Sequence, residues 1–314
     1  MAEIQTPENL NRGLSVLITG GSGLIGRYLT SALLSEGYSV SHLSRNEGTN
    51  GKVRVFKWNP EKKFVDPGAF ECVDYLIHLA GANIGEKLWT KRRKEEIVNS
   101  RVTSAGYLNE IISGNNLNLK AFITASATGY YGSVTSDKIF DEEDPPSEDF
   151  LGTTCRLWEE GADLFTRMGI RSVKIRTAVV LEKSDSALSK LMKPARFGLA
   201  VRLGSGRQYF PWIHIDDLCK IYIKAVKDEK MQGAYNAVAP EQLNHNDFVK
   251  TMAAVMGIPF FLPPVPSCVL KAALGEMSDI VLKGSRISCW KIINAGYIFR
   301  FDRLDGALKN VISG

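Results

Sequence analysis

A glycine-rich turn near the N-terminus, LITGGSGLIG, constrains the fold of this 314-residue chain more than any other stretch. The apolar run from Leu14 to Thr19 enters the turn as a buried parallel strand would. Ile25, Leu29 and Leu33 then follow at helical spacing. A strand that passes through a glycine turn directly into a helix is the first half of a β-α-β unit. The turn therefore predicts a parallel sheet.

Strand-like and helix-like segments continue to alternate as far as Leu181. We expect strands in YSVSHL, KVRVFKW, VDYLIHLAG, KAFITAS and SVKIRTAVVL, and long helices over about 86–113 and 151–167. This alternation indicates a parallel sheet covered by helices on both faces. Beyond Leu181 the pattern gives way to loops, prolines and isolated helices, with one return to the sheet near GAYNAVA.

The sequence thus predicts an α/β fold: a Rossmann-type doubly wound parallel sheet with a smaller C-terminal substrate or cap domain. We assign residues 14–181 and about 213–240 to the Rossmann-type domain, and residues 182–212 and 241–314 to the smaller, substrate-side domain. Residues 1–13 are expected to be a poorly ordered lead.

Charge patterning argues against a nucleic-acid partner. The net charge of +5, from 39 basic and 34 acidic residues, is spread along the chain. The one dense basic block, Lys91 to Lys94, is followed at once by Glu95 and Glu96, which is typical of a solvated helix face. Nowhere does a basic stripe with interleaved aromatic residues occur.

The cysteines and the apolar segments indicate a cytoplasmic protein without a membrane or metal partner. The 5 cysteines are scattered, and no pair has metal-type or redox-type spacing. The N-terminal segment has no apolar run of the kind a signal peptide needs. The longest uncharged stretch, Thr251 to Leu270, is interrupted by four prolines, which rule out a spanning helix there.

Each glycine of the turn has a use in binding a dinucleotide. Gly20 makes the turn, Gly23 lets a pyrophosphate approach the backbone, and Gly26 lets the helix pack closely. The helix N-terminus adds free N–H groups and the positive end of its dipole. The predicted cofactor contacts here are Gly20, Gly23, Leu24, Ile25 and Gly26.

The end of the second strand indicates which dinucleotide is bound. An acidic residue there would bind the ribose hydroxyls of NAD, whereas this chain has Ser44 and Arg45. A guanidinium can bind a 2′-phosphate through charge-assisted hydrogen bonds, worth about 1.5–3 kcal/mol. We therefore predict NADP(H) as the cofactor, preferred roughly ten- to a hundredfold. The alternative is a surface arginine that happens to lie there.

Further segments complete the predicted cofactor site. Leu79, Ala80 and Gly81 end the fourth strand and should pass under the adenine-side ribose. On the long helix, Arg101 is within reach of the cofactor's phosphates or ribose, with Glu96 five residues before it; the alternative for Arg101 is an exposed salt bridge. Val180, in the run RTAVVL, is the last predicted contact.

Five motifs, TGGSGLIG, HLAG, SATGYYG, RTAVVL and FPWIHIDDL, occur in an order that identifies a family. Together they resemble the extended short-chain dehydrogenase/reductases, the sugar-nucleotide epimerase/dehydratase superfamily, and most closely its atypical epimerase-like branch. The resemblance covers nearly the whole chain from about Leu14. It implies a nicotinamide cofactor and a Tyr-x-x-x-Lys pair, in which the lysine lowers the pKa of the tyrosine.

That pair is missing, because no Tyr-x-x-x-Lys occurs in the chain. A glutamate normally lies four residues after the lysine. Counting back from Glu159 puts Cys155 in the lysine position and Leu151 in the tyrosine position. Neither can do the missing work, and Arg156 is a poor substitute.

Other residues remain candidates for substrate chemistry. The serine of the usual triad is expected at Ser126, and Tyr130 and Tyr131 follow it as catalytic candidates, although a Tyr-Gly pair there is usually structural. The resemblance implies that the loop GSGRQYFPWIHIDDL faces the substrate, so Arg207 is the candidate for binding a phosphate or carboxylate.

Four more residues of that loop are expected to be structural. Trp212 and His214 are predicted to lie in the core, and Asp216 and Asp217 to cap the following helix.

Two functions stay open. The first is an NADP(H)-dependent oxidoreductase or epimerase-like enzyme that acts on a small polar molecule with an altered acid/base set. The second is a non-catalytic NADP(H) sensor or scaffold, which the missing pair favours. The resemblance also implies a homodimer formed through the helices over 86–113 and 151–167.

Overall fold

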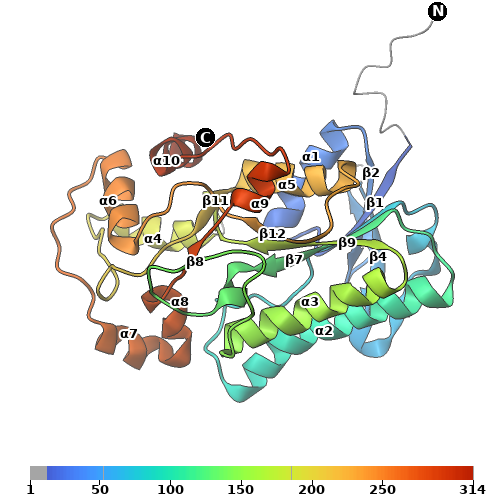
Figure 1. Ribbon diagram of the computed structural model, residues 1–314, viewed down its shortest axis with the longest axis horizontal. Helices are drawn as coiled ribbons and strands as arrows, with labels where there is room; N and C mark the ends of the chain where they lie inside the picture. The colour runs from blue at the N-terminus through green and yellow to red at the C-terminus, as the bar shows by residue number, and fades with distance from the viewer. Residues whose placement is uncertain (1–12, 52, 185, 314) are drawn as a thin grey trace, which may run out of the picture.

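The computed structural model describes residues 13–51, 53–184 and 186–313, so the predicted N-terminal lead lies, except for Gly13, outside the described residues. A largely parallel sheet fills its centre (Figure 1). The strands, in their order across the sheet, are β12 (Gly233–Ala237), β9 (Arg171–Thr177), β7 (Ala121–Ala127), β6 (Tyr75–His78), β1 (Ser15–Thr19), β2 (Ser39–Ser44), β4 (Val53–Asn59) and β3 (Gly48–Asn50). Two short strands, β3 and β5 (Phe64–Val65), pair antiparallel with β4.

The direction in which the chain crosses the sheet reverses between β1 and β6. From β1 the chain first moves outward through β2 to β4, and then returns to add β6, β7, β9 and β12 on the other side. The carboxyl ends on the two sides of such a reversal form the crevice where doubly wound sheets bind ligands. The predicted fold class is thus confirmed, and the glycine turn after β1 lies at the reversal.

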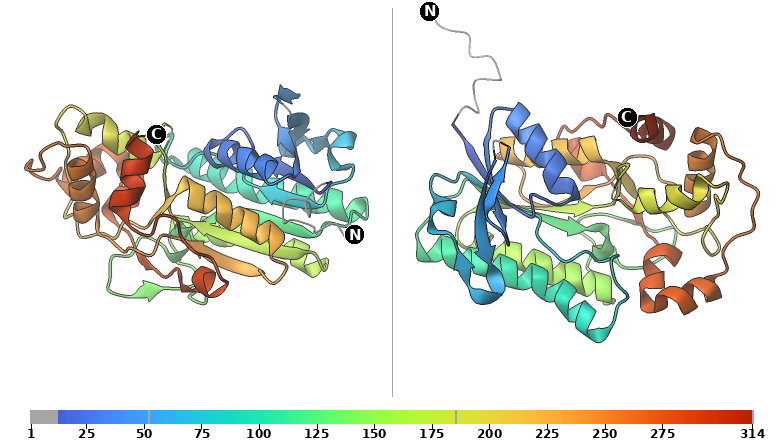
Figure 2. Two further views of the ribbon diagram at one scale, coloured as in Figure 1. Left: turned by 90° about the horizontal axis from the view of Figure 1, so that it is seen from above. Right: turned by 180° about the vertical axis from the view of Figure 1, so that it is seen from behind.

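Helices cover both faces of the sheet (Figure 2). On one face α1 (Leu24–Ser35) packs beside α5 (Ile215–Lys227), and on the other α2 (Lys91–Gly114) packs beside α3 (Phe150–Arg167). The strands supply apolar side chains to both layers because successive residues point to opposite faces. In β1, Val16 and Ile18 join the core under α1 and α5, while Leu17 joins the core under α2 and α3.

A third apolar cluster lies at the end of the molecule farthest from β4 (Figure 1). It is built on α4 (Ala187–Ala195), α6 (His245–Val255) and α10 (Leu304–Ser313), with Met192, Trp212 and Phe248 in its centre. Two short strand pairs lie outside the main sheet: β10 (Val179–Leu181) with β11 (Trp212–His214), and β13 (Arg286–Ile287) with β8 (Ile139–Phe140). The remaining helices are α7 (Ser267–Leu274), α8 (Asp279–Leu282) and α9 (Trp290–Asn294), of which α9 contacts β12 of the main sheet.

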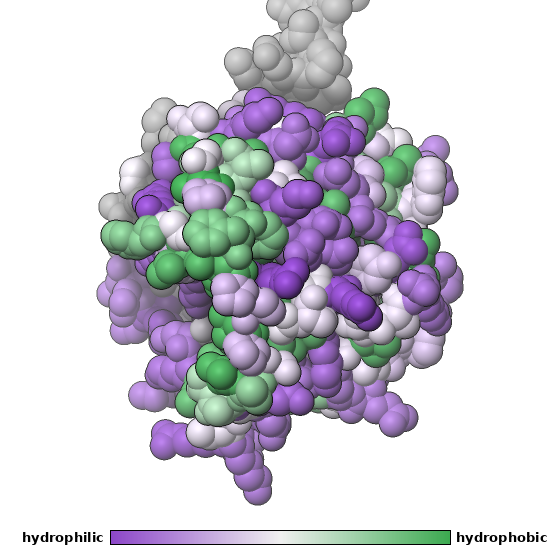
Figure 3. Space-filling model, turned by 90° about the vertical axis from the view of Figure 1, so that its left-hand side faces the viewer, coloured by the Kyte–Doolittle hydropathy of each residue, from purple (hydrophilic) through white to green (hydrophobic). Residues whose placement is uncertain are grey.

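Exposed apolar side chains gather at this same end (Figure 3). Phe197, just after α4, and Phe261, between α6 and α7, are 84% and 75% exposed. Among the described residues, the structure contains no helix that is both long and apolar enough to cross a bilayer.

Two of the predicted boundaries are wrong. The long helix begins at Lys91 rather than near Glu86, because the Thr90 side chain accepts a hydrogen bond from the Arg93 amide and starts the helix there. The run SVKIRTAVVL forms two strands in two sheets, β9 and β10. The break falls at Ala178, whose amide bonds the carbonyl of Ala237.

Candidate functional site

The glycine turn is packed too tightly for side chains at two of its three predicted positions. A Cβ atom on Gly20, whose φ is +71°, would lie 2.9 Å from the backbone nitrogen of Ala80. A Cβ on Gly26 would lie 2.5 Å from the carbonyl oxygen of Gly20. At Gly23 the nearest atom is 3.2 Å away, so this position is less crowded by protein.

No side chain among the described residues caps the N-terminus of α1, whose N-cap residue is Gly23. The Gly23 amide itself bonds the carbonyl of Gly20 at 3.0 Å. The first amides of α1 therefore face the crevice as donors for an anion, at the positive end of the helix dipole.

A fourth glycine, Gly21, was missed by the sequence analysis. A Cβ there would lie 2.5 Å from the ring of His42. This ring is buried and bonds Thr30 Oγ1 through Nε2 at 2.8 Å, and burial lowers the pKa of His42. The neutral His42 ring thus packs directly against the backbone of the turn at Gly21. In the sequence, the doubled glycine in TGGSG indicates such a close contact.

Ser44 and Arg45 lie at the carboxyl end of β2, next to the turn. Ser44 is half-buried and Arg45 is exposed. Because β2 pairs in parallel with β1, both residues share the edge where the turn lies. Arg45 forms no ion pair with any described residue, so its guanidinium is available to an anion.

The end of β6 lies directly against the turn. The Ala80 amide donates to Thr19 Oγ1 at 3.2 Å, and the Leu79 amide to the Thr19 carbonyl at 3.1 Å. Below them the fully buried His78 bonds Thr19 Oγ1 at 2.7 Å and Ser104 Oγ at 3.0 Å. Burial lowers the pKa of His78 to about 3, so this histidine is a neutral structural link.

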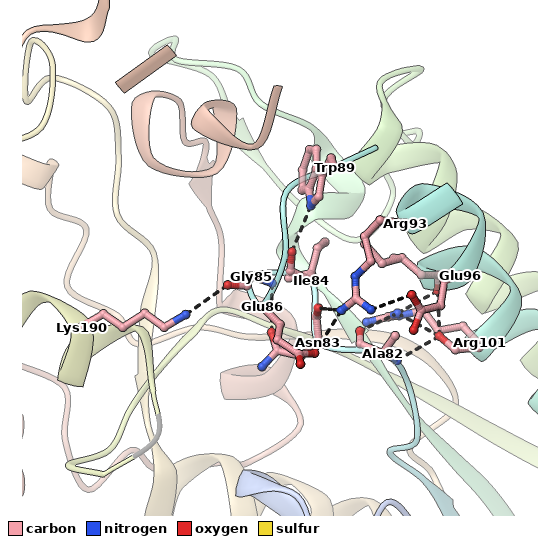
Figure 4. Close-up of polar contacts among 12 residues, drawn as sticks. Ala82, Asn83, Ile84, Gly85, Glu86, Trp89, Arg93, Glu96, Arg101 and Lys190 are labelled. Atoms are coloured by element: carbon pink, nitrogen blue, oxygen red, sulfur yellow. Dashed lines mark hydrogen bonds and ion pairs between the residues drawn. The ribbon is translucent and has the colours of Figure 1, made fainter. Parts of the chain in front are cut away.

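After Gly81 the chain enters a loop, residues 82–90, that is tied down from several sides (Figure 4). Arg93 donates to the Asn83 carbonyl and pairs with Glu96 at 2.8 Å. Lys190 of α4 donates to the Gly85 carbonyl at 3.1 Å. Glu96, a predicted cofactor contact, is thus an exposed carboxylate that forms an ion pair with Arg93 of the same helix.

Arg101 lies on the other side of Gly81 from the turn. A Cβ on Gly81 would be 3.1 Å from its guanidinium carbon, and Nη1 donates to the carbonyls of Ala82 at 3.2 Å and Ile97 at 2.8 Å. The guanidinium also lies 4.7 Å from the ring centre of Trp158 on α3. The alternative of an exposed salt bridge is wrong, because this side chain is half-buried and forms no ion pair among the described residues.

At the end of β7, two of the catalytic candidates, Ser126 and Tyr131, belong to a buried hydrogen-bond network. Ser126 Oγ donates to Glu159 at 2.6 Å, and Arg176 binds both oxygens of Glu159 at 2.8 and 2.9 Å. Tyr131 donates to Asn236 at 2.8 Å and accepts from Arg176 at 2.9 Å. Burial raises the pKa of Tyr131, so its phenol stays protonated.

Tyr130 and two residues of α3, Leu151 and Cys155, lie beside this network. The Arg176 guanidinium lies 3.5 Å from the ring centre of Tyr130, which is half-buried. Burial raises the pKa of Tyr130. Gly129 is close to both Leu151 and Cys155, and burial raises the pKa of the Cys155 thiol to about 12. No group at these two positions of α3 can therefore act as a base near neutral pH.

Comparison with known proteins agrees with this geometry. A sequence profile of the NAD dependent epimerase/dehydratase family matches residues 16–155, and one for a domain of unknown function matches residues 265–311. The epimerase family protein YfhF of Bacillus subtilis is 34% identical over 303 residues, which are 96% of this chain and 98% of YfhF. The epimerase family protein SDR39U1 of Mus musculus is 34% identical over 96% of this chain and 100% of its own length.

This chain belongs to the epimerase family.

Solved structures support the same assignment. The crystal structure of human SDR39U1, isoform 2, with NADPH has a TM-score of 0.85 and 29% identity, and covers 96% of this chain and 99% of the human one. A nucleoside-diphosphate sugar epimerase from Corynebacterium glutamicum has a TM-score of 0.75 and 31% identity over 94% of this chain and 57% of its own.

In this epimerase family protein, the substrate-side candidate Arg207 is exposed and lines a pocket of about 430 Å³. The other lining residues are Arg202, Gly204, Ser205, Gly206, Asn244, Asn246 and Pro264. Two arginines in one polar pocket are suited to a carboxylate or phosphate. Val180, in contrast, is a half-buried residue of β10 that pairs with Ile213 and packs against the main core.

The expectation for Trp212 and His214 is confirmed, since both are buried. The capping role expected for Asp216 and Asp217 is wrong. His214 is the N-cap, and its Nδ1 accepts from the Asp216 amide at 3.1 Å. Asp217 is fully buried and accepts hydrogen bonds from the Tyr297 hydroxyl and two amides, those of residues 300 and 301.

Proposed function

We propose that this protein binds NADP(H) along the carboxyl edge of its sheet. Arg45 would bind the 2′-phosphate, the first amides of α1 the pyrophosphate, and residues 79–81 the middle of the cofactor. Two neighbouring features carry the proposal. The N-terminus of α1, in the glycine turn after β1, has no side-chain cap, and Arg45, which follows the adjacent strand β2, has no ion-pair partner among the described residues. The human relative, whose crystal structure holds NADPH, supports it.

The deciding experiment titrates NADPH and NADH into the protein and into Arg45→Ala by calorimetry. We expect NADPH to bind roughly ten- to a hundredfold more tightly than NADH, and Arg45→Ala to lose most of that preference. Arg54→Ala, on neighbouring β4, is a matched control because its guanidinium already lies 4.4 Å from the ring centre of Phe56. Equal affinity of the native protein for both cofactors would refute the proposal.

We further propose that the protein is an oxidoreductase for a small polar carbonyl compound. A bound nicotinamide would supply the hydride. Of the three candidates at the end of β7, Ser126 and Tyr131 already donate their hydroxyl protons to Glu159 and Asn236. Tyr130 is therefore the proposed proton donor, in keeping with a raised pKa that keeps its phenol protonated at neutral pH.

The pocket around Arg202 and Arg207 supports a substrate that carries a carboxylate or phosphate. The test incubates the NADPH-loaded protein with a panel of anionic aldehydes and ketones and follows NADPH absorbance. Turnover that is lost in Tyr130→Phe but kept in Tyr107→Phe, an unrelated tyrosine of α2, would support this reading. If NADPH binds but its absorbance does not change with any compound of the panel, the result favours the alternative, a non-catalytic NADP(H) sensor or scaffold.

A homodimer through α2 and α3 is part of the same proposal. These two helices pack side by side on one face of the sheet and lie at the surface of the molecule (Figure 1). A molar mass measured by light scattering should equal twice that of the chain, and charge reversal on exposed positions of α2 should reduce it to a monomer.

A further inference from the structure

Arg101 is held in a fixed position at the carboxyl end of β6. Its Nη1 donates to the carbonyls of Ala82 at 3.2 Å and Ile97 at 2.8 Å (Figure 4). Its guanidinium carbon lies over the ring of Trp158, 4.7 Å from the ring centre. Gly81 separates this guanidinium from the crevice by backbone alone. A Cβ atom on Gly81 would lie 3.1 Å from the guanidinium carbon. The charge therefore lies immediately beside the backbone that the cofactor is proposed to cross.

The charge of Arg101 has no carboxylate partner among the described residues. Two arginines that are more deeply buried than the half-buried Arg101 are paired: Arg93 with Glu96 at 2.8 Å and Arg176 with Glu159 at 2.8 Å. Buried charges in proteins are normally paired in this way. Burial lowers the pKa of the Arg101 guanidinium, which is the direction expected of a cation that has lost water without gaining an anion.

The strand order places Arg101 at one particular half of the proposed cofactor site. Arg45 follows β2, the glycine turn follows β1, and Arg101 flanks the end of β6 on the side toward α3. A dinucleotide with its 2′-phosphate on Arg45 and its pyrophosphate at the turn must extend past β6 toward β7. Arg101 is thus on the nicotinamide side of the turn.

From this position we infer that Arg101 makes the site selective for the reduced cofactor, NADPH, over NADP⁺. The inference rests on the proposed cofactor site. The two forms carry the same phosphates and differ by the positive charge of the oxidised nicotinamide ring. An uncompensated guanidinium in a partly buried crevice repels that ring and leaves the neutral dihydronicotinamide unaffected, which corresponds to roughly tenfold or more in relative affinity.

The test measures dissociation constants of both NADPH and NADP⁺ for four proteins. The native protein should bind NADPH roughly tenfold or more tightly than NADP⁺. Arg101→Gln, which keeps amide donors for the Ala82 carbonyl but loses the charge, should reduce the ratio several-fold, chiefly through tighter NADP⁺ binding. Arg101→Lys keeps the charge and should keep the ratio. Arg92→Gln, an exposed residue of the same helix, should leave both constants unchanged.

Three outcomes would overturn the inference: equal affinities of the native protein for the two forms, an unchanged ratio in Arg101→Gln, or an equal loss of the ratio in Arg101→Lys and Arg101→Gln. The first needs no variant, so the inference can fail even if the substitutions disturb folding. Absence of binding of either form to the native protein is a different result, because it would refute the proposed cofactor site itself.

Discussion

The glycines of the turn differ in whether the fold itself or a bound cofactor requires them to lack a side chain. At Gly20 and Gly26 an added Cβ would meet backbone atoms at 2.9 Å or less, so both positions are needed for the fold. At Gly23 the backbone is in an ordinary extended conformation, with φ −71°, and the nearest atom to a Cβ is 3.2 Å away. Gly23 therefore has a looser structural constraint than its neighbours and a stronger reason, if a pyrophosphate lies there, to lack a side chain.

We predict that Gly23→Val abolishes NADPH binding while the protein stays folded, because the side chain would occupy the space of the pyrophosphate. Calorimetry measures the binding, and circular dichroism with thermal unfolding measures the fold. Gly106→Val, at a position of α2 where an added Cβ meets nothing within 4 Å, is the matched control and should bind normally. Normal NADPH binding by Gly23→Val would mean that the cofactor does not cross this turn.

At the scale of single elements, strand β9 shows how a buried ion pair differs from an exposed one. Arg176 and Glu159 are 4% and 6% exposed and bind each other through two hydrogen bonds. Two positions earlier on the strand, Lys174 pairs with Asp163, whose side chain is 42% exposed. Removing one partner of the buried pair leaves a desolvated charge, whereas Asp163 can be rehydrated.

We predict that Arg176→Met lowers the free energy of unfolding by about 3–5 kcal/mol, and that Lys174→Met lowers it by no more than about 1 kcal/mol. Urea denaturation followed by circular dichroism gives both values. The double variant Arg176→Met/Glu159→Leu should recover part of the loss, since it removes the unpaired carboxylate. Equal effects of the two single variants would show that the Glu159 network is not desolvated as the structure has it.

Helix α3 has no acid or base at Leu151 or Cys155 that could act near neutral pH. We predict that the protein has little or no UDP-sugar epimerase activity, although it belongs to the epimerase family. The motif comparison made from the sequence predicts Leu151 and Cys155 in the tyrosine and lysine positions of the pair, and burial raises the pKa of the Cys155 thiol, so it is protonated near neutral pH. Positioned acid and base groups typically contribute about 10²–10⁴-fold in rate. Chromatography of a nucleotide-sugar panel incubated with NADP⁺- and NADPH-loaded protein checks this, and robust turnover would contradict it.

The elements predicted from sequence were mostly those with strong local signals. The turn, the succession of strand segments along the chain and the helix over 151–167 follow from glycine placement and apolar periodicity. What could not be predicted depends on contacts between distant segments: Ser126 with Glu159, the unpaired state of Arg101, and Asp217 with Tyr297. Asp217 was expected to cap a helix because a sequence shows the residues adjacent in the chain and not the segment that returns to it 80 positions later.

At the scale of the whole molecule, the four histidines behave alike. His42, His78, His214 and His245 are all buried, and burial lowers the pKa of each, to about 3 for His78 and about 4 for His245. In the unfolded chain they titrate near their ordinary value of about 6.5. Below that pH the unfolded state binds more protons than the folded state, so acid favours unfolding.

We predict that the free energy of unfolding is constant with respect to these histidines above about pH 7 and falls as the pH drops from about 6.5 toward 4, by up to about 1.4 kcal/mol per pH unit for each histidine. Urea titrations at a series of pH values measure this slope. His245→Gln should make the slope shallower between pH values of about 6.5 and 5, where most carboxylates stay ionised. A stability independent of pH over that interval would contradict the burial of these rings.

The C-terminal segment is tied to residues near the middle of the chain, and this affects when the protein can finish folding during synthesis. Strand β13 completes its pairing with β8, the Ser288 carbonyl accepts from Asn236, and Asp217 receives the amides of residues 300 and 301. Residues 286–301 leave the ribosome after all strands of the main sheet have emerged. Until residues 286–301 have emerged, the Asp217 carboxylate on α5 and the Asn236 side-chain amide on β12 lack these buried hydrogen bonds, and a chain truncated before them would expose both groups to chaperones and proteases.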